Sequence, residues 1–336
     1  MAQKRGASGL SLVVCVDKPS GMTSHDVVNA CRRIFGERRV GHTGTLDPLA
    51  TGVLPICVGP ATRLDQYLVG HIKTYEARIA FGAATDTCDA WGTVIERAQV
   101  PSSLMDESVA RSCLAKMLGS HMQIPPAFSA IKVQGRRAYD EARAGRDVEL
   151  EAREVVISKA DLLGISSDEE TGFVNWDVVF SVSPGTYVRA LARDLGGMLS
   201  CPAHIASLRR TYVGPIGINE CVTLEELEVS TIDAAIDPVP LLGYRVAIAK
   251  GEQKAKLANG NPFSREELDL FVLSKARFEE RLDACSSLLT ESDAEPFVRE
   301  PVCILSEGTL RAIYAFDADR NQYRPRTIFS QGVFRG

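Results

Sequence analysis

Closely spaced metal ligands are missing from this sequence. Its nine cysteines form no CxxC pair, and the two that lie nearest in sequence, Cys15 and Cys31, are sixteen positions apart. The five histidines show neither HxH nor HxxxH spacing. Structural zinc sites take their ligands from close pairs, and intracellular proteins seldom carry a disulfide framework. We therefore expect neither a metal site nor disulfide bridges.

Long apolar runs are missing as well. No run approaches the ~20 residues that span a bilayer. The apolar run Leu10–Val16, which follows a short polar N-terminus, ends at Asp17. This is not the pattern of a signal peptide, and we expect a cytoplasmic protein with no membrane segment. The sequence contains neither a GxGxxG nor a P-loop spacing, so a loop that cradles nucleotide phosphates is not indicated.

The charge balance changes along the chain. Of the 336 residues, 45% are hydrophobic and 24% are charged, which is typical of a globular protein of about two domains. Lys and Arg equal Asp and Glu in number over residues 1–220, so residues 221–336 account for the whole net charge of −5. A domain with no net charge still binds RNA when its positive and negative charges lie on different faces.

Apolar periodicity predicts an α+β fold in which strands and helices are interspersed. Ser24 is predicted to cap a helix that ends before Gly36. Strands are expected at Leu10–Val16, Ile56–Val58, Thr74–Phe81, Val148–Leu163, Phe173–Val182, Val246–Ala249, Pro301–Leu305 and Leu310–Phe316, and helices at Ala61–Leu68, Met105–Leu118 and Tyr187–Leu199. The Pro-rich stretch Asp237–Pro240 indicates a linker. We therefore expect a first domain at residues 1–242 and a small β-rich domain at residues 243–336.

One loop presents a single carboxylate on a constrained backbone. It runs from Gly41 to Pro55 with the sequence GHTGTLDPLATGVLP. Pro48 disfavours helical backbone at Asp47, and the glycines allow a ligand to approach the backbone closely. On chemistry alone, an ordinary Asp-Pro turn is the commoner explanation of these residues.

The same loop closely resembles the signature loop of TruB-type pseudouridine synthases. The resemblance implies that Asp47 is the catalytic carboxylate and that His42 engages the flipped-out target nucleotide. Upstream, the sequence VDKPSGMTS at residues 16–24 resembles the first motif of the family. This match implies that Lys18 lies at the substrate site, in a structural or RNA-proximal role.

Further segments resemble motifs of the family in the same order: KTYE at residues 73–76, TDTCD at 85–89, GTYVR at 185–189 and LRR at 208–210. The resemblance implies that Tyr187 and Arg189 act in the active site. It also implies that the ring of Tyr75 packs against the target base and that Leu208 lines the uracil pocket. Without the resemblance, a core tyrosine in a strand and the first turn of an amphipathic helix would explain these residues.

The resemblance runs from about Leu10 to Leu227 and is weaker beyond. It implies a mixed-sheet catalytic domain followed by a small PUA-like domain, and an enzyme that isomerises uridine 55 in the T arm of tRNA without a cofactor. Isomerisation breaks the bond from N1 to the ribose, turns the uracil and re-bonds it through C5. The reaction needs an ionised carboxylate, and Arg189 is the candidate to stabilise that charge. Whether Asp47 attacks the base, attacks C1′ or removes a ribose proton stays open.

A basic segment lies within the first domain. Lys132, Arg136 and Arg137, followed by Arg143 and Arg146, set five positive charges against two negative ones over residues 131–146. A solvated helix face explains such a segment about as often as a binding surface does. Its place in the T-arm-binding insertion of the family favours contact with RNA.

Three alternatives are open. Archaeal and eukaryotic relatives of the family work with a guide RNA and dock on accessory proteins. The acidic C-terminal region of this chain favours instead a monomer with no obligatory protein partner. A non-catalytic RNA-binding protein would not need Asp47, Tyr75, Tyr187 and Arg189 together. A glycosidase usually needs two placed carboxylates, and it would release free uracil.

Overall fold

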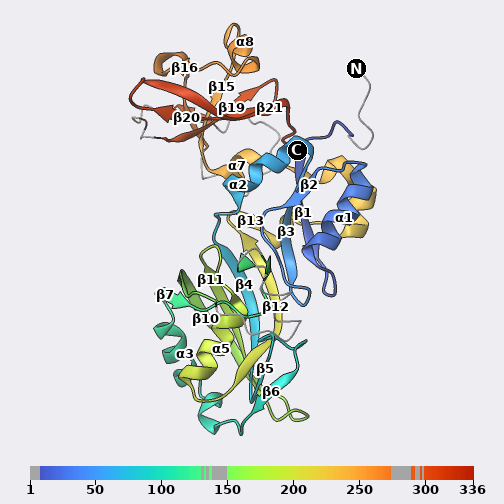
Figure 1. The fold of residues 1–336 in the computed structure, drawn as a ribbon, viewed down its shortest axis with the longest axis vertical. Helices are drawn as coiled ribbons and strands as arrows, with labels where there is room; N and C mark the ends of the chain where they lie inside the picture. The colour runs from blue at the N-terminus through green and yellow to red at the C-terminus, as the bar shows by residue number, and fades with distance from the viewer. Residues whose placement is uncertain are drawn as a thin grey trace.

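The structure is a computed structural model that describes residues 8–129, 132–133, 136–137, 150–273, 289–291, 296 and 299–336. It is an elongated body built on two sheets, with the C-terminal sheet at one end and a long central sheet running to the other (Figure 1). The mixed strand directions of the large sheet, the helices between its strands and the β-rich C-terminal part confirm the predicted α+β fold.

A ten-stranded sheet forms the central part of the molecule. Its order is β14-β1-β3-β12-β4-β11-β10-β7, with β2 paired to β3 and β13 paired to β12. The strands are β1 (Leu12–Lys18), β2 (Val40–His42), β3 (Thr51–Val58), β4 (Lys73–Phe81), β7 (Gly119–Gln123), β10 (Arg153–Ser167), β11 (Val174–Val182), β12 (Ala203–Val213), β13 (Ile216–Gly217) and β14 (Ala235–Ile236). Neighbours are antiparallel except for β3 and β12, which run parallel.

Short helices connect these strands. They are α1 (Ser24–Phe35), α2 (Asp65–Leu68), α3 (Glu107–Lys116), α5 (Val188–Met198), α6 (Leu224–Ser230) and α7 (Pro238–Leu242), with 3-10 segments at Gly59–Leu64, Ser102–Met105, Ile218–Glu220 and Thr231–Ala234. Within the described ranges, no helix has both the length and the apolar character needed to cross a membrane.

The N-cap of α1 is not the predicted one. Thr23, whose backbone is extended, accepts a hydrogen bond from the Asp26 N–H, and the Asp26 carboxylate accepts one from the Thr23 N–H. This capping box replaces the cap predicted at Ser24, because Ser24 already has helical backbone. Gly36 ends the helix in the left-handed conformation, as predicted.

Alternation along the strands gives the large sheet two apolar faces. On β1, Val14 and Val16 belong to the main core, which α1 and α5 cover, while Val13 and Cys15 belong to a second core on the opposite face. Both faces are therefore buried in this region, and the main-core face is the one that leads to the loop around Asp47.

A seven-stranded sheet forms the C-terminal part, in the order β16-β21-β20-β19-β15-β17-β18. Its strands are β15 (Arg245–Ile248), β16 (Phe263–Ser264), β17 (Phe271–Leu273), β18 (Leu289–Glu291), β19 (Pro301–Ser306), β20 (Thr309–Asp317) and β21 (Gln322–Val333), with helix α8 (Gln253–Ala258) and a 3-10 segment at Arg265–Glu267. Two small ladders complete the fold: β5 (Ala83–Thr85) with β6 (Val94–Arg97), and β8 (Lys132–Val133) with β9 (Arg136–Arg137).

The Pro-rich stretch that was expected to be a linker begins helix α7 instead. The Asp237 side chain accepts from the Val239 N–H, and Pro238 occupies the first helical position, where its fixed φ suits a helix. Val239 is buried in the second core, which also contains Val246 and Cys303 of the C-terminal sheet. The two sheets thus share a core across the 242/243 boundary, and that boundary stays a prediction.

Candidate active site

The loop that carries Asp47 is held by side chains from outside it. The Ser20 hydroxyl donates to the Leu49 carbonyl at 3.2 Å. The Ser24 hydroxyl donates to the Leu46 carbonyl at 3.0 Å and accepts from the Leu46 N–H at 2.8 Å. Leu46 and Leu49 are both buried in the main core. Asp47 therefore projects from a turn that is anchored on either side.

The loop ends where β3 meets β12 at very short range. Gly52 has a φ of +104°, and a Cβ there would lie 2.1 Å from the carbonyl oxygen of Arg210. Only glycine fits such an approach. Thr51 and Gly52 pair in parallel with Arg209 and Arg210, so the loop is fixed against the strand that carries Leu208.

Arg189 binds Asp47 through two hydrogen bonds. Its Nε donates to Oδ2 at 2.8 Å and its Nη2 donates to Oδ1 at 3.0 Å. Such bidentate, charge-assisted pairs fix the orientation of a carboxylate as well as its charge. The Arg189 side chain is 6% exposed, whereas that of Asp47 is 33% exposed and is accessible to a ligand. The structure thus brings together the cation and the carboxylate that the sequence pointed to.

Two further donors of Arg189 bond to backbone carbonyls of the protein. Nη1 donates to the Thr87 carbonyl at 2.8 Å, and Nη2 donates to the Phe128 carbonyl at 3.0 Å. Nη1 also lies 3.7 Å from Oδ2 of Asp89, which is buried. A guanidinium has five N–H donors, and four of them take part in hydrogen bonds within the protein. Arg189 is therefore built to hold Asp47 rather than to bind a substrate.

Lys18 supports the loop that carries Asp47 from inside the protein, and its expected place at the substrate site stays a prediction. Its side chain is fully buried. Its ammonium donates to the carbonyls of Pro19 at 2.8 Å, Met22 at 2.7 Å and Pro48 at 3.4 Å. The three ammonium donors are thus used within the protein, and one of them supports the loop beside Asp47.

Tyr75 and Leu208 lie on one face of the sheet. Tyr75 on β4 is opposite Arg210 on β12, and Leu208 is opposite Ala77. Directly opposed residues in a sheet point to the same side, and Tyr75 and Leu208 both belong to the main core with Leu46. Both are nearly buried, at 6% and 7% exposure, and their predicted contact with the target base stays a prediction.

His42 stands at the end of β2, where the loop begins. Its Nδ1 accepts from the Gly44 N–H at 3.3 Å. Burial lowers the pKa of His42, against the opposing effect of the Asp65 carboxylate. The imidazole is therefore neutral at neutral pH, a form suited to stacking against a base.

Tyr187 is positioned by a side chain that the sequence analysis missed. Gln123, on the edge strand β7, accepts from the Tyr187 N–H at 2.8 Å and donates to the Tyr187 carbonyl at 3.2 Å. Gln123 is buried, at 2% exposure. Burial raises the pKa of Tyr187, so its phenol stays protonated at neutral pH.

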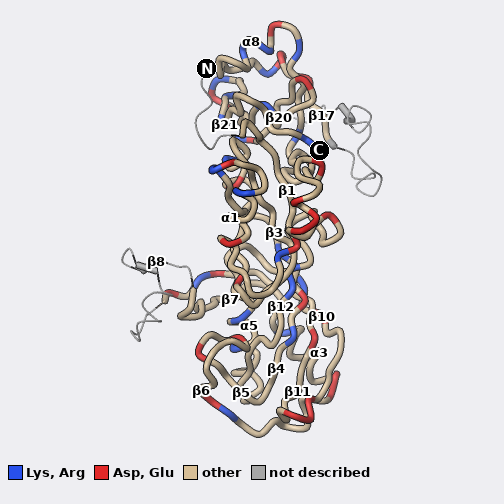
Figure 2. Tube along the Cα trace, turned by 90° about the vertical axis from the view of Figure 1, so that its right-hand side faces the viewer, with Lys and Arg blue, Asp and Glu red and all other residues tan. Residues whose placement is uncertain are grey.

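The basic residues Lys132, Arg136 and Arg137 lie in the β8–β9 ladder, in which Lys132 pairs with Arg137. Their backbone is described, but their side chains lie outside the described part of the structure, as do Arg143 and Arg146 altogether. Over the rest of the molecule, residues of both charge signs occur along the whole length (Figure 2). The predicted RNA-binding role of the ladder stays a prediction.

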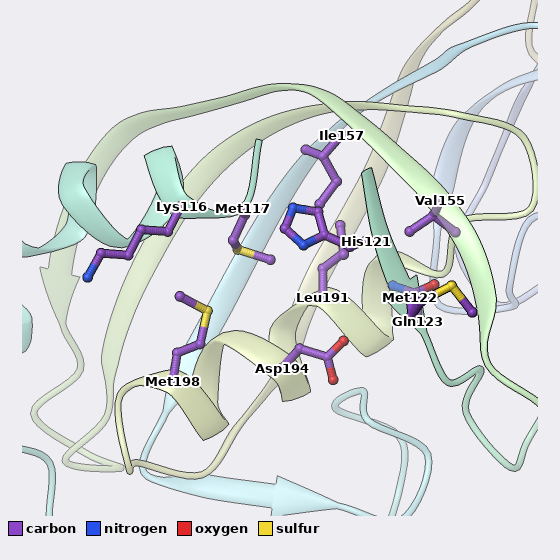
Figure 3. A pocket seen from close by; sticks show the side chains of 10 residues that line it. All are labelled: Lys116, Met117, His121, Met122, Gln123, Val155, Ile157, Leu191, Asp194 and Met198. Atoms are coloured by element: carbon purple, nitrogen blue, oxygen red, sulfur yellow. The ribbon is translucent and has the colours of Figure 1, made fainter. Parts of the chain in front are cut away.

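A cavity of about 210 Å³ is lined in part by Gln123 and by none of the predicted site residues. Side chains from α3, β7, β10 and α5 surround it (Figure 3). The lining residues are Lys116, Met117, His121, Met122, Gln123, Val155, Ile157, Leu191, Asp194 and Met198.

In the described ranges, no group of three or more His, Cys, Asp or Glu side chains could hold a metal ion.

The sequence analysis did not single out Lys73 and Arg210, two cations that are 8% and 0% exposed, although a simple signal marks them. Each occupies a core-facing position in an alternating strand, two residues from Tyr75 and from Leu208 respectively. A cation at such a position indicates an internal role. Asp89 is the second acid of the TDTCD segment, but nothing in the sequence shows that it faces Arg189.

Two family models match the sequence in succession. The first, described as TruB family pseudouridylate synthase (N terminal domain), covers residues 32–188. The second, described as tRNA pseudouridylate synthase B C-terminal domain, covers residues 189–239. Together they contain Asp47, Tyr75, Tyr187, Arg189 and Leu208.

Proteins with similar sequences are named as pseudouridine synthases. The tRNA pseudouridine synthase B of Thermobifida fusca (strain YX) is 49% identical over 217 residues, which are 64% of this chain and 73% of that protein. That of Mycobacterium leprae (strain TN) is 42% identical over 275 residues, which are 80% of this chain and 85% of that protein. A solved structure of an H/ACA RNP bound to a substrate RNA containing 2′-deoxyuridine shares the fold. It aligns over 96% of this chain and 86% of that chain, with a TM-score of 0.64 and 20% identity.

Proposed function

This chain belongs to the TruB family of pseudouridylate synthases, and we propose that it converts uridine 55 in the T loop of tRNA to pseudouridine. The observation that carries the proposal is the anchored, accessible Asp47 carboxylate, oriented by two hydrogen bonds from Arg189. The reaction is an isomerisation, because the same atoms are present before and after the uracil is re-bonded through C5.

The target uridine must leave its stack before it reacts, at a cost of a few kcal/mol. Tyr75 offers an aromatic face and Leu208 an apolar wall on the same side of the sheet. His42 is neutral and lies at the start of the catalytic loop, where it takes up the displaced nucleotide. Tyr187, fixed by Gln123, packs its ring against the base and ribose.

The proposal assigns Asp47 the chemical step and Arg189 the positioning of Asp47. A carboxylate held in a fixed orientation meets the ribose and the base without reorganisation of its surroundings, which is the usual source of enzymatic rate enhancement. Lys18 supports the loop from beneath. No side chain in this proposal depends on a cofactor.

The substrate is a tRNA T arm, which Lys132, Arg136 and Arg137 contact through its phosphates. RNA of this shape is recognised largely through its backbone. The proposal also includes a monomer in the cytoplasm that needs no protein partner. The acidic charge of residues 221–336 supports the absence of a partner bound through a basic tail.

The test uses pure full-length protein and a tRNA transcript with no other protein. We expect pseudouridine at position 55 alone, mapped by chemical modification and primer extension. Asp47→Asn should lower the single-turnover rate by roughly 1,000-fold or more and leave tRNA binding unchanged. Free uracil in the supernatant would identify a hydrolase, and Asp47→Asn activity within tenfold of wild type would refute the role of Asp47.

A further inference from the structure

Two cysteines from distant parts of the sequence lie side by side in the fold. Cys15 is in β1, and Cys221 lies shortly before helix α6. The residues that follow them, Val16 and Val222, form a parallel β-bridge. The Asp17 N–H donates to the Val222 carbonyl at 2.9 Å, and the Val222 N–H donates to the Cys15 carbonyl at 3.0 Å. Cys15 and Cys221 are therefore next to each other in the register of this bridge, and we refer to them as the thiol pair.

The side chains of the thiol pair lie on one face of the sheet. Val16 and Val222 pack in the main core, whereas Cys15 and Cys221 pack in the second core on the opposite face, as alternation along a strand requires. The two thiols are hydrogen-bonded to each other. The Cys221 thiol also donates to the Gly217 carbonyl at 3.7 Å. The two sulfur atoms are thus in contact before any reaction takes place.

The backbone spacing of the thiol pair suits a disulfide bond. Neighbouring strands lie about 4.8 Å apart, and disulfides join cysteines whose Cα atoms are roughly 4.4 to 6.8 Å apart. Cys57 of β3 packs in the same core, but it is opposite Val13, while Cys15 is opposite Pro55. Such diagonal neighbours lie roughly 7 to 8 Å apart. Cys221, and not Cys57, is therefore the partner that Cys15 can reach without movement of the backbone.

The two members of the pair differ in their access to solvent. Cys15 is 1% exposed. Burial, together with the hydrogen bond to Cys221, holds its pKa well above the usual value, so Cys15 stays a thiol at neutral pH. Cys221 is only partly buried, so a small oxidant can reach its sulfur first. A neighbouring thiol can then condense with the resulting sulfenic acid to form a disulfide.

We propose that the thiol pair is a modification site for hydroperoxides, at which oxidation joins Cys15 and Cys221 in a reversible disulfide. The Cys221 sulfur first takes one oxygen from the hydroperoxide, which is reduced to water or an alcohol. The Cys15 sulfur then attacks the Cys221 sulfur, and the Cys15 proton leaves with the hydroxyl group as a second molecule of water. The two sulfur atoms together lose the two electrons that the hydroperoxide gains.

The reaction protects the accessible member of the pair. A sulfenic acid that is not resolved is oxidised further to sulfinic and sulfonic acids, and these steps are irreversible in most proteins. A disulfide between Cys15 and Cys221 stops this sequence, and a thiol reductant restores both thiols. Both are free in the structure, which is the reduced state from which the reaction starts.

The test follows the masses of the two cysteine peptides. Reduced full-length protein is treated with hydrogen peroxide, its remaining thiols are alkylated under denaturing conditions, and its peptides are mapped by mass spectrometry without reduction. In the wild type we expect one crosslinked peptide that contains Cys15 and Cys221 and lacks two hydrogens relative to the separate peptides. Dithiothreitol should remove the crosslink completely.

Three variants separate the roles of the thiols. Cys15→Val keeps an apolar side chain in the strand but removes the resolving thiol, so the Cys221 peptide should gain two or three oxygens instead. Cys221→Ser should leave the buried Cys15 unoxidised. The matched control is Cys57→Ala, which changes the same core and should form the same crosslink as the wild type. Circular dichroism confirms that each variant is folded.

Several results would overturn the inference. They are a wild-type Cys221 that stays a thiol, a wild-type Cys221 that gains oxygens without a link to Cys15, and a crosslink that is lost in folded Cys57→Ala. If Cys15→Val does not fold, Cys221→Ser decides, because oxidation of Cys15 in that variant would show that Cys221 is not the sulfur that reacts first. None of these results bears on the proposed function, because the test measures the masses of peptides and uses no RNA.

Discussion

Asp47 and Arg189 are 142 positions apart in the sequence, yet two hydrogen bonds of 2.8 and 3.0 Å join them. Arg189 also donates hydrogen bonds to the carbonyls of Thr87 and Phe128 and lies 3.7 Å from the buried Asp89 carboxylate, and these contacts hold its guanidinium in place. The Asp47 carboxylate is therefore oriented, through Arg189, by contacts from three separate segments of the chain.

Arg189→Lys should lower the single-turnover rate while affinity for tRNA changes little. Lysine keeps the positive charge but cannot form the planar two-bond contact with Asp47. Misplacing a catalytic group by about 1 Å costs roughly 100-fold in rate. The matched control is Arg193→Lys on the same helix, because Arg193 is 37% exposed and pairs with its neighbour Asp194. A rate for Arg189→Lys equal to that of the control would show that charge alone suffices.

Tyr187→Phe should slow the final step of the reaction, loss of the proton from C5. The raised pKa of Tyr187 keeps its hydroxyl protonated, so the hydroxyl can act only by relaying the proton onward. Rapid-quench experiments on uridine-containing tRNA should show slower formation of pseudouridine. A tRNA with fluorine at C5 of the target base has no such proton, and formation of its first C-glycoside should be nearly unaffected. Equal slowing with both substrates would assign the hydroxyl to positioning or to glycosidic cleavage.

Lys73→Met should change the stability of the protein in a pH-dependent way. The pKa of Lys73 is lowered from 10.5 to about 8, so between these values the unfolded chain holds more protons than the folded one. The stability that Lys73 contributes is therefore lowest below pH 8 and rises as the pH increases towards 10.

Urea unfolding of wild type and Lys73→Met at pH 7.5 and pH 10 measures this effect. The wild type should gain on the order of 2 to 3 kcal/mol relative to the variant between the two pH values. Lys159→Met, which removes an exposed lysine of β10, should show no such gain. A difference between wild type and Lys73→Met that does not change with pH would mean that Lys73 has the same pKa in the folded and the unfolded chain, so that burial does not lower it.

Arg136→Ala with Arg137→Ala should weaken tRNA binding and make it less sensitive to salt. Each phosphate contact that is lost should reduce the slope of log affinity against log salt by roughly 0.7 to 0.9. Filter binding from 50 to 300 mM salt measures the slope. Arg111→Ala, on α3, removes an exposed arginine that pairs with Glu107 and serves as the control. If the double variant has the same slope as Arg111→Ala, the side chains of Arg136 and Arg137 contact solvent and no phosphate.

The sequence was most informative where alternation or capping is strong. The strands around Thr74–Phe81 and Phe173–Val182 and the helix that ends before Gly36 occur within about two residues of their predicted bounds. Strand β3 begins at Thr51 rather than at the predicted Ile56. The first half of β3 was not predicted because it contains Gly52 and Pro55, and such residues normally interrupt strands. In this strand, Gly52 allows the backbone to approach Arg210 closely.

The site was predictable through its resemblance to a family, and its internal support was not. Asp47 and Arg189 could be named in advance, but the carbonyls of Thr87 and Phe128 that hold Arg189 carry no signal in a sequence. The motif that contains Lys18 implied a structural or RNA-proximal role at the substrate site, but no local pattern showed that its ammonium would donate to the Pro48 carbonyl. Side-chain direction within a motif depends on tertiary packing, which a local pattern does not specify.

The second core has a consequence for the modularity of the chain. Cys15 of β1 and Val53 of β3, which back the active-site loop, pack in one core with Cys303 and Val333 of the C-terminal sheet. Apolar contacts of this kind make neighbouring units unfold together. The C-terminal sheet is thus not an interchangeable module: exchange with the corresponding part of a relative would succeed only if the rear face of the catalytic sheet were exchanged with it.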